Sequence, residues 1–167
     1  MVANYFTINH FDIQEETMMK RILSLILAGL FVLGLTTVAF ADSSPDQAKA
    51  LVKEAVAYVK ANGKDKALAE FSNPKGQFVK ADLYIFVVDM NGVMIAHGAN
   101  QKLIGTNMMD KKDPDGVPFI KKFVEVGKQG GGWVDYKWPH PVTKQVTPKT
   151  SYVEEVDGII VGCGVHK

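Results

Sequence analysis

The chain begins its regular hydrophobic pattern at residue 44. From Ser44 and Pro45 onward, apolar residues recur at spacings of three and four, which predicts an amphipathic helix ending near Asn62-Gly63. Ser44 suits the N-cap of this helix and Pro45 its first turn. Lys64 to Phe71 predicts a second, shorter helix, and residues 73–76 have the composition of a turn.

The pattern then changes to strands. Runs of apolar, β-branched and aromatic residues between turn residues predict strands at Leu83 to Asp89, Val93 to His97, Trp133 to Trp138, Val146 to Val156 and Ile159 to Val165. Asn91-Gly92 is a hairpin signal between the first two strands, and Pro118 to Gly127 predicts a helix before the third. A hairpin, a helical crossover and a three-stranded meander predict an α+β domain. We expect a PAS-like five-stranded antiparallel sheet with a long N-terminal helix.

Residues 18–41 have the pattern of a secretory signal peptide. Lys20-Arg21 precedes the apolar run Ile22 to Val38, and small residues follow at Ala39 and Ala41. We expect cleavage between Ala41 and Asp42, and therefore a periplasmic or secreted protein. The alternative is an uncleaved membrane anchor, because the run approaches the roughly 17 to 25 residues that span a bilayer.

The residues ahead of the signal peptide have the wrong charge for its beginning. Residues 1–17 carry acidic residues and no lysine or arginine. We expect them to be an untranslated or non-native extension, with the working domain at residues 42–167.

Composition and motifs argue against several classes of function. The net charge of +1 is too small to indicate nucleic-acid binding. Cys163 is the only cysteine, so no disulfide forms within the chain, and its place between two glycines of an apolar strand predicts inert packing. Residues 110–116 superficially resemble a calcium loop but place lysines where oxygen ligands belong. Without a recognisable nucleophile motif either, we expect no enzyme, no metal and no cofactor.

Two segments carry a resemblance to a known family: YIFVVDMNGVMIAHGANQKLIGTNMMDKKDPDGVPFIKKFVE and GGGWVDYKWPHPVTKQVTPKTSYVEEVDGIIVGCGV. They resemble the single Cache domain of the second type, and the resemblance runs from Val52 to Val165. It implies an extracytoplasmic sensor domain of the kind found in bacterial chemoreceptors and kinases, with a pocket on the sheet face opposite the long helix. It also implies a small carboxylate ligand such as acetate, propionate, lactate or pyruvate. Since the chain stops soon after its last strand, we expect a free-standing periplasmic member that signals through a membrane-bound receptor or kinase.

Candidate ligand-binding residues follow from alternation along the strands and from the family motif. Buried tyrosine and tryptophan require hydrogen-bond partners, and donors that converge in an apolar cleft suit a small anion. We assign to this site Tyr84, Phe86, His97, Tyr136, Trp138, Lys149 and Tyr152. For each aromatic residue, the alternative is an ordinary place in the core.

Alternation along the strands also predicts which side chains point toward the pocket and which point to the other face of the sheet. It groups His97 with Val93 and Ile95, and it places Lys137 opposite Tyr136, on the surface. Lys149 follows Pro148 and can give a carboxylate a charge-assisted hydrogen bond, although a solvated surface lysine is the alternative.

Tyr152 is three residues from Lys149, so the two share a face only if Pro148 interrupts the strand. The function we expect is extracytoplasmic sensing of a small molecule in signal transduction. The alternative is an accessory or structural domain with a degenerate pocket.

The signal-peptide prediction is tested by the mass of the protein isolated from periplasmic material. We expect a species that starts at Asp42, because the small-x-small pattern ends at Ala41. A dominant species that retains residues 22–38 would identify a membrane anchor instead.

Overall fold

The computed structural model describes residues 43–167. The extension at residues 1–17, the signal peptide and the predicted cleavage site lie outside the described residues. Among the helices of residues 43–167, none is long and apolar enough to span a membrane.

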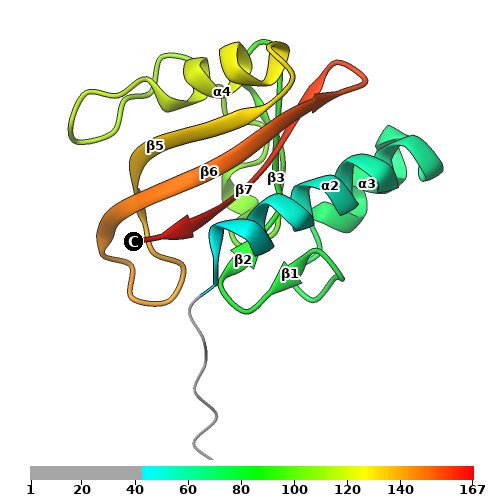
Figure 1. Cartoon of the computed structure of the whole chain (residues 1–167), viewed down its shortest axis with the longest axis horizontal. Coiled ribbons are helices and arrows are strands. Elements are labelled where there is room, and N and C mark those ends of the chain that lie inside the picture. Colours follow the sequence, from blue (N-terminus) through cyan, green and yellow to red (C-terminus); the bar gives the residue numbers. More distant parts are fainter. Residues whose placement is uncertain (1–42) are drawn as a thin grey trace, which may run out of the picture. The chain divides into compact units, whose positions relative to one another are not determined.

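The described chain forms three α-helices, one short 3-10 helix and seven strands (Figure 1). In chain order these are α2 (Pro45–Asn62), α3 (Lys64–Phe71), β1 (Val79–Lys80), β2 (Leu83–Tyr84), β3 (Phe86–Asp89), β4 (Met94–His97), η1 (Gln101–Leu103), α4 (Phe119–Lys128), β5 (Gly132–Pro139), β6 (Val146–Val156) and β7 (Ile159–His166). The predicted helices and four of the five predicted strands are present, with small shifts at their ends. The predicted strand Leu83 to Asp89 is divided at Ile85 into β2, which pairs with β1, and β3, which belongs to the five-stranded sheet. The small β1–β2 hairpin is the element that the hydrophobic pattern did not predict.

Five strands form one antiparallel sheet in the order β4-β3-β7-β6-β5. The last strand, β7, lies at its centre, between the first hairpin and the β5–β6 hairpin. The chain crosses from β4 to β5 through α4, as the element order predicted. The predicted α+β fold with a five-stranded antiparallel sheet is confirmed.

Helix α2 begins where the sequence predicts. The Ser44 hydroxyl accepts a hydrogen bond from the backbone N–H of Gln47 at 3.2 Å, and the Gln47 side chain accepts from the backbone N–H of Ser44 at 2.8 Å. This reciprocal capping box satisfies two backbone donors at the start of the helix, and Pro45 occupies its first turn.

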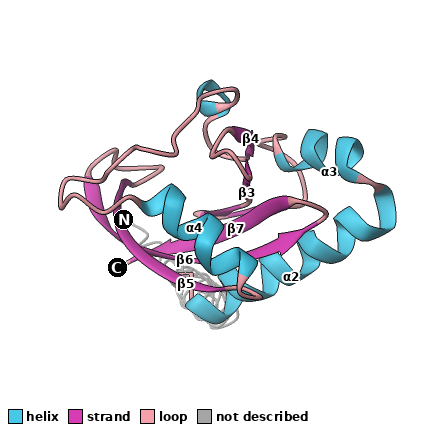
Figure 2. Ribbon diagram, turned by 90° about the horizontal axis from the view of Figure 1, so that it is seen from above, coloured by secondary structure: helices cyan, strands magenta, loops and turns pink. Residues whose placement is uncertain are grey.

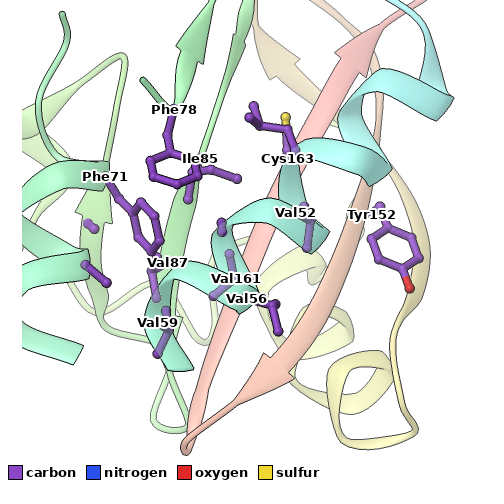
Figure 3. Packing of buried hydrophobic residues seen from close by; sticks show 14 of the residues in the cluster. Val52, Val56, Val59, Phe71, Phe78, Ile85, Val87, Tyr152, Val161 and Cys163 are labelled. Atoms are coloured by element: carbon purple, nitrogen blue, oxygen red, sulfur yellow. The ribbon is translucent and has the colours of Figure 1, made fainter. Parts of the chain in front are cut away.

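One face of the sheet carries an apolar core against α2 and α3. Residues from α2 such as Val52 and Val59 pack on Val87 of β3 and Val161 of β7 (Figure 3). The side chains of this cluster are almost entirely nonpolar, and their burial stabilises the domain at roughly 25 cal/mol per Å² of apolar surface removed from water.

The other face of the sheet packs against α4. In Figure 2, α4 and α2 lie over different faces of the sheet. Phe119 and Phe123 of α4 contact aromatic residues of the strands, and Phe86 stacks on Phe123 at 5.2 Å between ring centroids. This second core contains polar side chains among its aromatic rings, and the candidate site lies here.

A β-bulge in β4 corrects one prediction about the faces. Phe86 pairs with His97 and Val87 with Ala96, but Val88 pairs with Met94, so Ile95 is an extra residue. Met94 therefore shares the α4 side of the sheet with His97, whereas Ile95 packs against the α2 core. The predicted grouping of Ile95 with His97 is wrong because the bulge shifts the alternation by one residue.

Asp113 fastens the loop before α4 to the edge strand β5. Its carboxylate is buried and accepts backbone N–H groups from Asp115 at 2.9 Å, Val117 at 2.8 Å and Lys137 at 2.7 Å. Burial opposes ionisation of this carboxyl group, but the three hydrogen bonds favour the carboxylate and hold the pKa of Asp113 below its usual value. The bond to Lys137 also occupies a backbone donor of an edge strand, which limits pairing with other chains.

We predict that Asp113→Asn lowers the free energy of unfolding by about 1 to 3 kcal/mol at pH 7, measured by urea denaturation. The amide cannot accept all three donors, so one backbone N–H loses its partner. Because the pKa of Asp113 is depressed in the folded state, its contribution is complete above the unfolded value of about 3.9 and is lost as the pH falls through the folded value. The difference between the two proteins should therefore shrink in acid.

Asp110→Asn, an exposed carboxylate of the same loop, is the matched control and should change stability little. Equal stability of all three proteins at pH 7 would show that Asp113 does not fasten the loop.

Candidate anion-binding site

Five of the predicted site residues meet at one small cavity between the sheet and α4. Tyr84 comes from β2, Phe86 from β3 and His97 from β4, while Tyr136 and Trp138 come from β5. Met94 and the α4 residues Phe119, Ile120 and Phe123 complete the lining. The cavity volume is about 10 Å³, which is room for about one water molecule.

Lys149 lies behind this cavity and does not line it. Its side chain is 1% exposed, and its Nζ donates a hydrogen bond of 2.8 Å to the Tyr84 hydroxyl oxygen. The same Nζ lies 4.4 Å from the centroid of the Tyr84 ring, and Tyr136 is the residue opposite Lys149 in the β5–β6 ladder. Lys149 therefore forms a polar cluster with Tyr84 and Tyr136, and it reaches the cavity only through Tyr84.

The charge of Lys149 has no carboxylate beside it within residues 43–167. All ion pairs of this range involve other lysines. Burial alone lowers the pKa of the Lys149 amine, but the neighbouring Tyr136 and Tyr84 favour its charged form and hold its pKa above the usual lysine value. The cluster therefore carries a buried positive charge at neutral pH.

Two glycines of β7 make the space for this arrangement. A Cβ at Gly164 would lie 2.0 Å from the Ser151 Oγ, 2.5 Å from the Thr150 carbonyl oxygen and 2.9 Å from the Lys149 Cε. A Cβ at Gly162 would lie 2.3 Å from the Phe86 ring. The glycines on both sides of Cys163 thus allow the lysine stem and the phenylalanine ring to lie flat on the sheet.

Ser151 is a member of the cluster that the sequence analysis missed. It is fully buried, and its Oγ lies 3.0 Å from the Tyr136 hydroxyl oxygen. Burial raises the pKa of Tyr136 to about 12, so this hydroxyl keeps its proton at neutral pH. The signal for Ser151 was present, because it is two residues from Lys149 and shares its face of β6.

His97 has a defined tautomer. Its ring is 3% exposed, and its Nδ1 accepts the backbone N–H groups of Ala99 at 3.2 Å and Asn100 at 2.9 Å. Burial, together with the nearby charge of Lys149, lowers the pKa of His97 to about 4. The ring is therefore neutral above this pH, and its proton must be on Nε2, which makes Nε2–H a donor.

Tyr152 lies on the opposite face of the sheet, and its predicted place beside Lys149 is corrected. It packs in the α2 core, edge-on to Trp133 at 5.4 Å between ring centroids, and Lys49 of α2 lies 5.3 Å from its ring centroid (Figure 3). Its hydroxyl donates to Glu154 at 3.3 Å. Pro148 does not interrupt β6, so ordinary alternation holds along the whole strand.

Lys137 and Cys163 lie where alternation and hydrophobicity predicted. The Lys137 side chain is 38% exposed and pairs with Asp115 at 2.9 Å. Cys163 is fully buried in the α2 core, and burial raises the pKa of its thiol to about 12 (Figure 3).

A larger cleft opens beside the small cavity. Its volume is about 470 Å³, and it shares Tyr84, His97 and Trp138 with the cavity. The remaining lining comes from residues 99–103 and from the β5–β6 turn, together with Lys111. These three shared side chains form the boundary between an enclosed polar cluster and an open cleft.

The chemistry available to this site is donation of hydrogen bonds to an anion. The cluster and the cavity offer an ammonium, two tyrosine hydroxyls, an imidazole N–H and an indole N–H, and no aspartate or glutamate of residues 43–167 lines the cavity or the cleft. In the same range, no group of three His, Cys, Asp or Glu side chains is placed to hold a metal ion.

The model of the family Single Cache domain 2 matches residues 35–166 of this chain. The sensor histidine kinase MctS of Rhizobium johnstonii is 39% identical over 87 residues, which are 51% of this chain and 19% of the kinase. The methyl-accepting chemotaxis protein McpP of Pseudomonas putida is 35% identical over 88 residues, or 51% of this chain and 16% of that protein. The match thus spans less than a fifth of the length of either relative.

Solved structures give the same assignment of the fold. A methyl-accepting chemotaxis protein from Vibrio parahaemolyticus superposes with a TM-score of 0.63 and 26% identity, over 72% of this chain and 86% of that one. A Cache chemosensory domain, whose structure is described as a basis for carboxylic acid recognition, superposes with a TM-score of 0.56 and 26% identity, over 95% and 99% of the two chains.

We predict that Gly164→Ala on β7 disrupts the cluster on the neighbouring strand β6. The added methyl group meets a backbone carbonyl as well as the Ser151 and Lys149 side chains, so β6 and β7 must shift. We expect a loss of about 1 to 3 kcal/mol in the free energy of unfolding, measured by urea denaturation. Val161→Ala in the α2 core is a comparison that removes volume and leaves the cluster intact. Unchanged stability of Gly164→Ala would contradict the close packing of Lys149 on β7.

Proposed function

The chain belongs to the single Cache domain 2 family, and we propose that it senses a small organic acid whose carboxylate is bound by the cluster around Lys149. The chain is a Cache sensor domain of the kind found in chemotaxis proteins and histidine kinases. Cache domains are extracellular or periplasmic ligand-binding domains. The choice of a carboxylate ligand and of its binding residues is the proposal.

The buried charge of Lys149 is the observation that carries this proposal. This ammonium is 1% exposed and has no carboxylate partner among residues 43–167, so its charge is supported by tyrosines and is not neutralised within the described part of the chain. A carboxylate that enters the cavity would meet this charge together with neutral donors. Hydrogen bonds to charged groups contribute roughly 1.5 to 3 kcal/mol each, about twice the value for neutral pairs.

Tyr84 transmits the charge to the cavity. Because its hydroxyl oxygen accepts the Lys149 N–H, its own O–H proton is free to point toward a ligand. A hydroxyl that accepts from an ammonium is polarised and becomes a stronger donor. The pair Lys149 and Tyr84 therefore acts as one unit, with His97 Nε2–H as a second donor on the same cavity.

The proposed ligand is a small carboxylic acid, and the proposed recipient of the signal is a membrane protein. The small cavity and the adjoining cleft, which share Tyr84 and His97, together suit a small acid in the class of acetate, propionate, lactate or pyruvate. A carboxylic acid is also the ligand class named for one of the similar Cache domains. We propose that the domain lies in the periplasm and passes its signal to a membrane-bound receptor or kinase.

A thermal-shift screen of the purified protein tests the function directly. Small carboxylates, amines and amino acids would be compared at the same concentration. Binding to the folded state alone raises stability by roughly 2.7 kcal/mol at a hundredfold excess over Kd, so a carboxylate ligand should raise Tm clearly. A rise with amines only, or with no compound, would contradict the proposal and favour an accessory domain with a degenerate pocket.

We predict that Lys149→Met weakens carboxylate binding about tenfold to hundredfold, as measured by titration calorimetry, because it removes a charge-assisted hydrogen bond of roughly 1.5 to 3 kcal/mol. Methionine keeps most of the volume of the stem, so the fold should persist. Tyr84→Phe should weaken binding as well, and the double variant should lose less than the sum because the two residues act through one hydrogen bond.

Lys137→Ala is the matched control, since this lysine is half-exposed and lies on the other face of the sheet. Its Kd should equal that of the unmodified protein. An acid that binds all these variants with the same Kd would place the ligand site elsewhere and leave Lys149 a structural residue.

A further inference from the structure

We infer that the ligand has two anionic ends, and that the second end lies in the open cleft beside the small cavity. This inference rests on the proposed function, keeps its small organic acid, and adds a second anionic group that acetate, propionate, lactate and pyruvate lack. The carboxylate at the inner end would be the group that meets Tyr84, and the outer end would meet a set of lysines that the proposed function does not use.

The open cleft is lined by cations without acids. Lys102, Lys111 and Lys144 line it, and no aspartate or glutamate does within residues 43–167. The four ion pairs of this range use other lysines, so the three cleft lysines have no ion-pair partner there. Lys111 is held over the Trp138 ring at 5.4 Å from its centroid, at the boundary with the small cavity. Three separate segments of the chain therefore give the cleft a positively charged lining.

The sizes of the two spaces place nearly all the volume of a ligand that contacts Tyr84 in the cleft. The small cavity holds about 10 Å³, which is enough for about one water molecule, whereas the cleft holds about 470 Å³. Tyr84, His97 and Trp138 line both spaces, so a carboxylate held by Tyr84 can lie at this boundary with the rest of its molecule in the cleft among the lysines.

The buried ring of His97 supports a ligand that passes this boundary. Its side chain is 3% exposed, and the two backbone N–H groups on Nδ1 leave Nε2–H as its donor. No hydrogen bond from Nε2 occurs within the described residues, and His97 lines both spaces, so this N–H is available to a ligand at their boundary. The inner carboxylate can accept this N–H together with the Tyr84 O–H, which fixes its position at the entrance to the cleft.

Calorimetric titration with three compounds of one carbon-chain length tests the inference. Succinate has two carboxylates, monomethyl succinate has one carboxylate and an ester, and butyrate has one carboxylate and a methyl end. We expect succinate to bind at least about tenfold more tightly than either of the others at low salt, and this advantage to shrink as salt screens the exposed lysines. Combining Lys102→Gln, Lys111→Gln and Lys144→Gln should remove most of the advantage and leave butyrate binding unchanged.

The control variant combines Lys60→Gln, Lys64→Gln and Lys75→Gln, which makes the same change in net charge at exposed positions away from the cleft. It should keep the full preference for succinate. If butyrate binds as tightly as succinate, or the preference survives loss of the cleft lysines, the inference is overturned while the proposed function stands. If acetate, propionate, butyrate and succinate all fail to bind, the proposed function itself fails.

Discussion

A buried lysine ammonium on the face of a sheet is the constraint to which the rest of this structure is adapted. Moving such a charge out of water costs several kcal/mol unless polar groups surround it. Lys149 is supported by the Tyr84 hydroxyl and lies opposite Tyr136 in the strand ladder. Its stem fits because Gly164 has no side chain. Strand β7 therefore has a glycine beside the charged part of β6, and a side chain at that position would displace Lys149.

The two faces of the sheet differ in polarity, and the proposed ligand site lies on only one of them. The face under α2 is a nearly pure apolar core, and Cys163 and Tyr152 contribute to it. The face under α4 combines aromatic packing with a polar cluster, which costs some of the stabilisation that an apolar core would provide. Because alternate residues of β6 point to different faces, Lys149 and Ser151 can be polar while Tyr152 and Val156 pack in the α2 core. The single strand β6 thus contributes to the apolar core on one face and to the polar cluster on the other, with regular strand geometry throughout.

The sequence was sufficient to predict the fold and five of the residues that line the small cavity, since both depend on local periodicity. Period-two alternation placed Tyr136 and Trp138 on one face, and the Asn-Gly signal placed the first hairpin. The extra residue in β4 could not be predicted, because a bulge leaves no mark in the hydrophobic pattern, so Ile95 was grouped with the wrong face. Tyr152 shows the opposite case: strict alternation was right, and the exception assumed at Pro148 was wrong. The open cleft depends on loops that meet only in three dimensions.

The protonation states of the cluster suggest why a charge of this kind suits a sensor. His97 has a pKa of about 4 and Tyr136 one of about 12, so neither changes its charge near neutral pH. Lys149, with a pKa above its usual value, also keeps its charge there. An organic acid with a carboxyl pKa near 4 is fully ionised over the same range. Recognition between a constant cation and a constant anion depends on ligand concentration alone. If the proposed ligand is right, a site built in this way would report the amount of an acid and not moderate changes of pH, because burial keeps His97 and Tyr136 neutral and the tyrosines keep Lys149 charged.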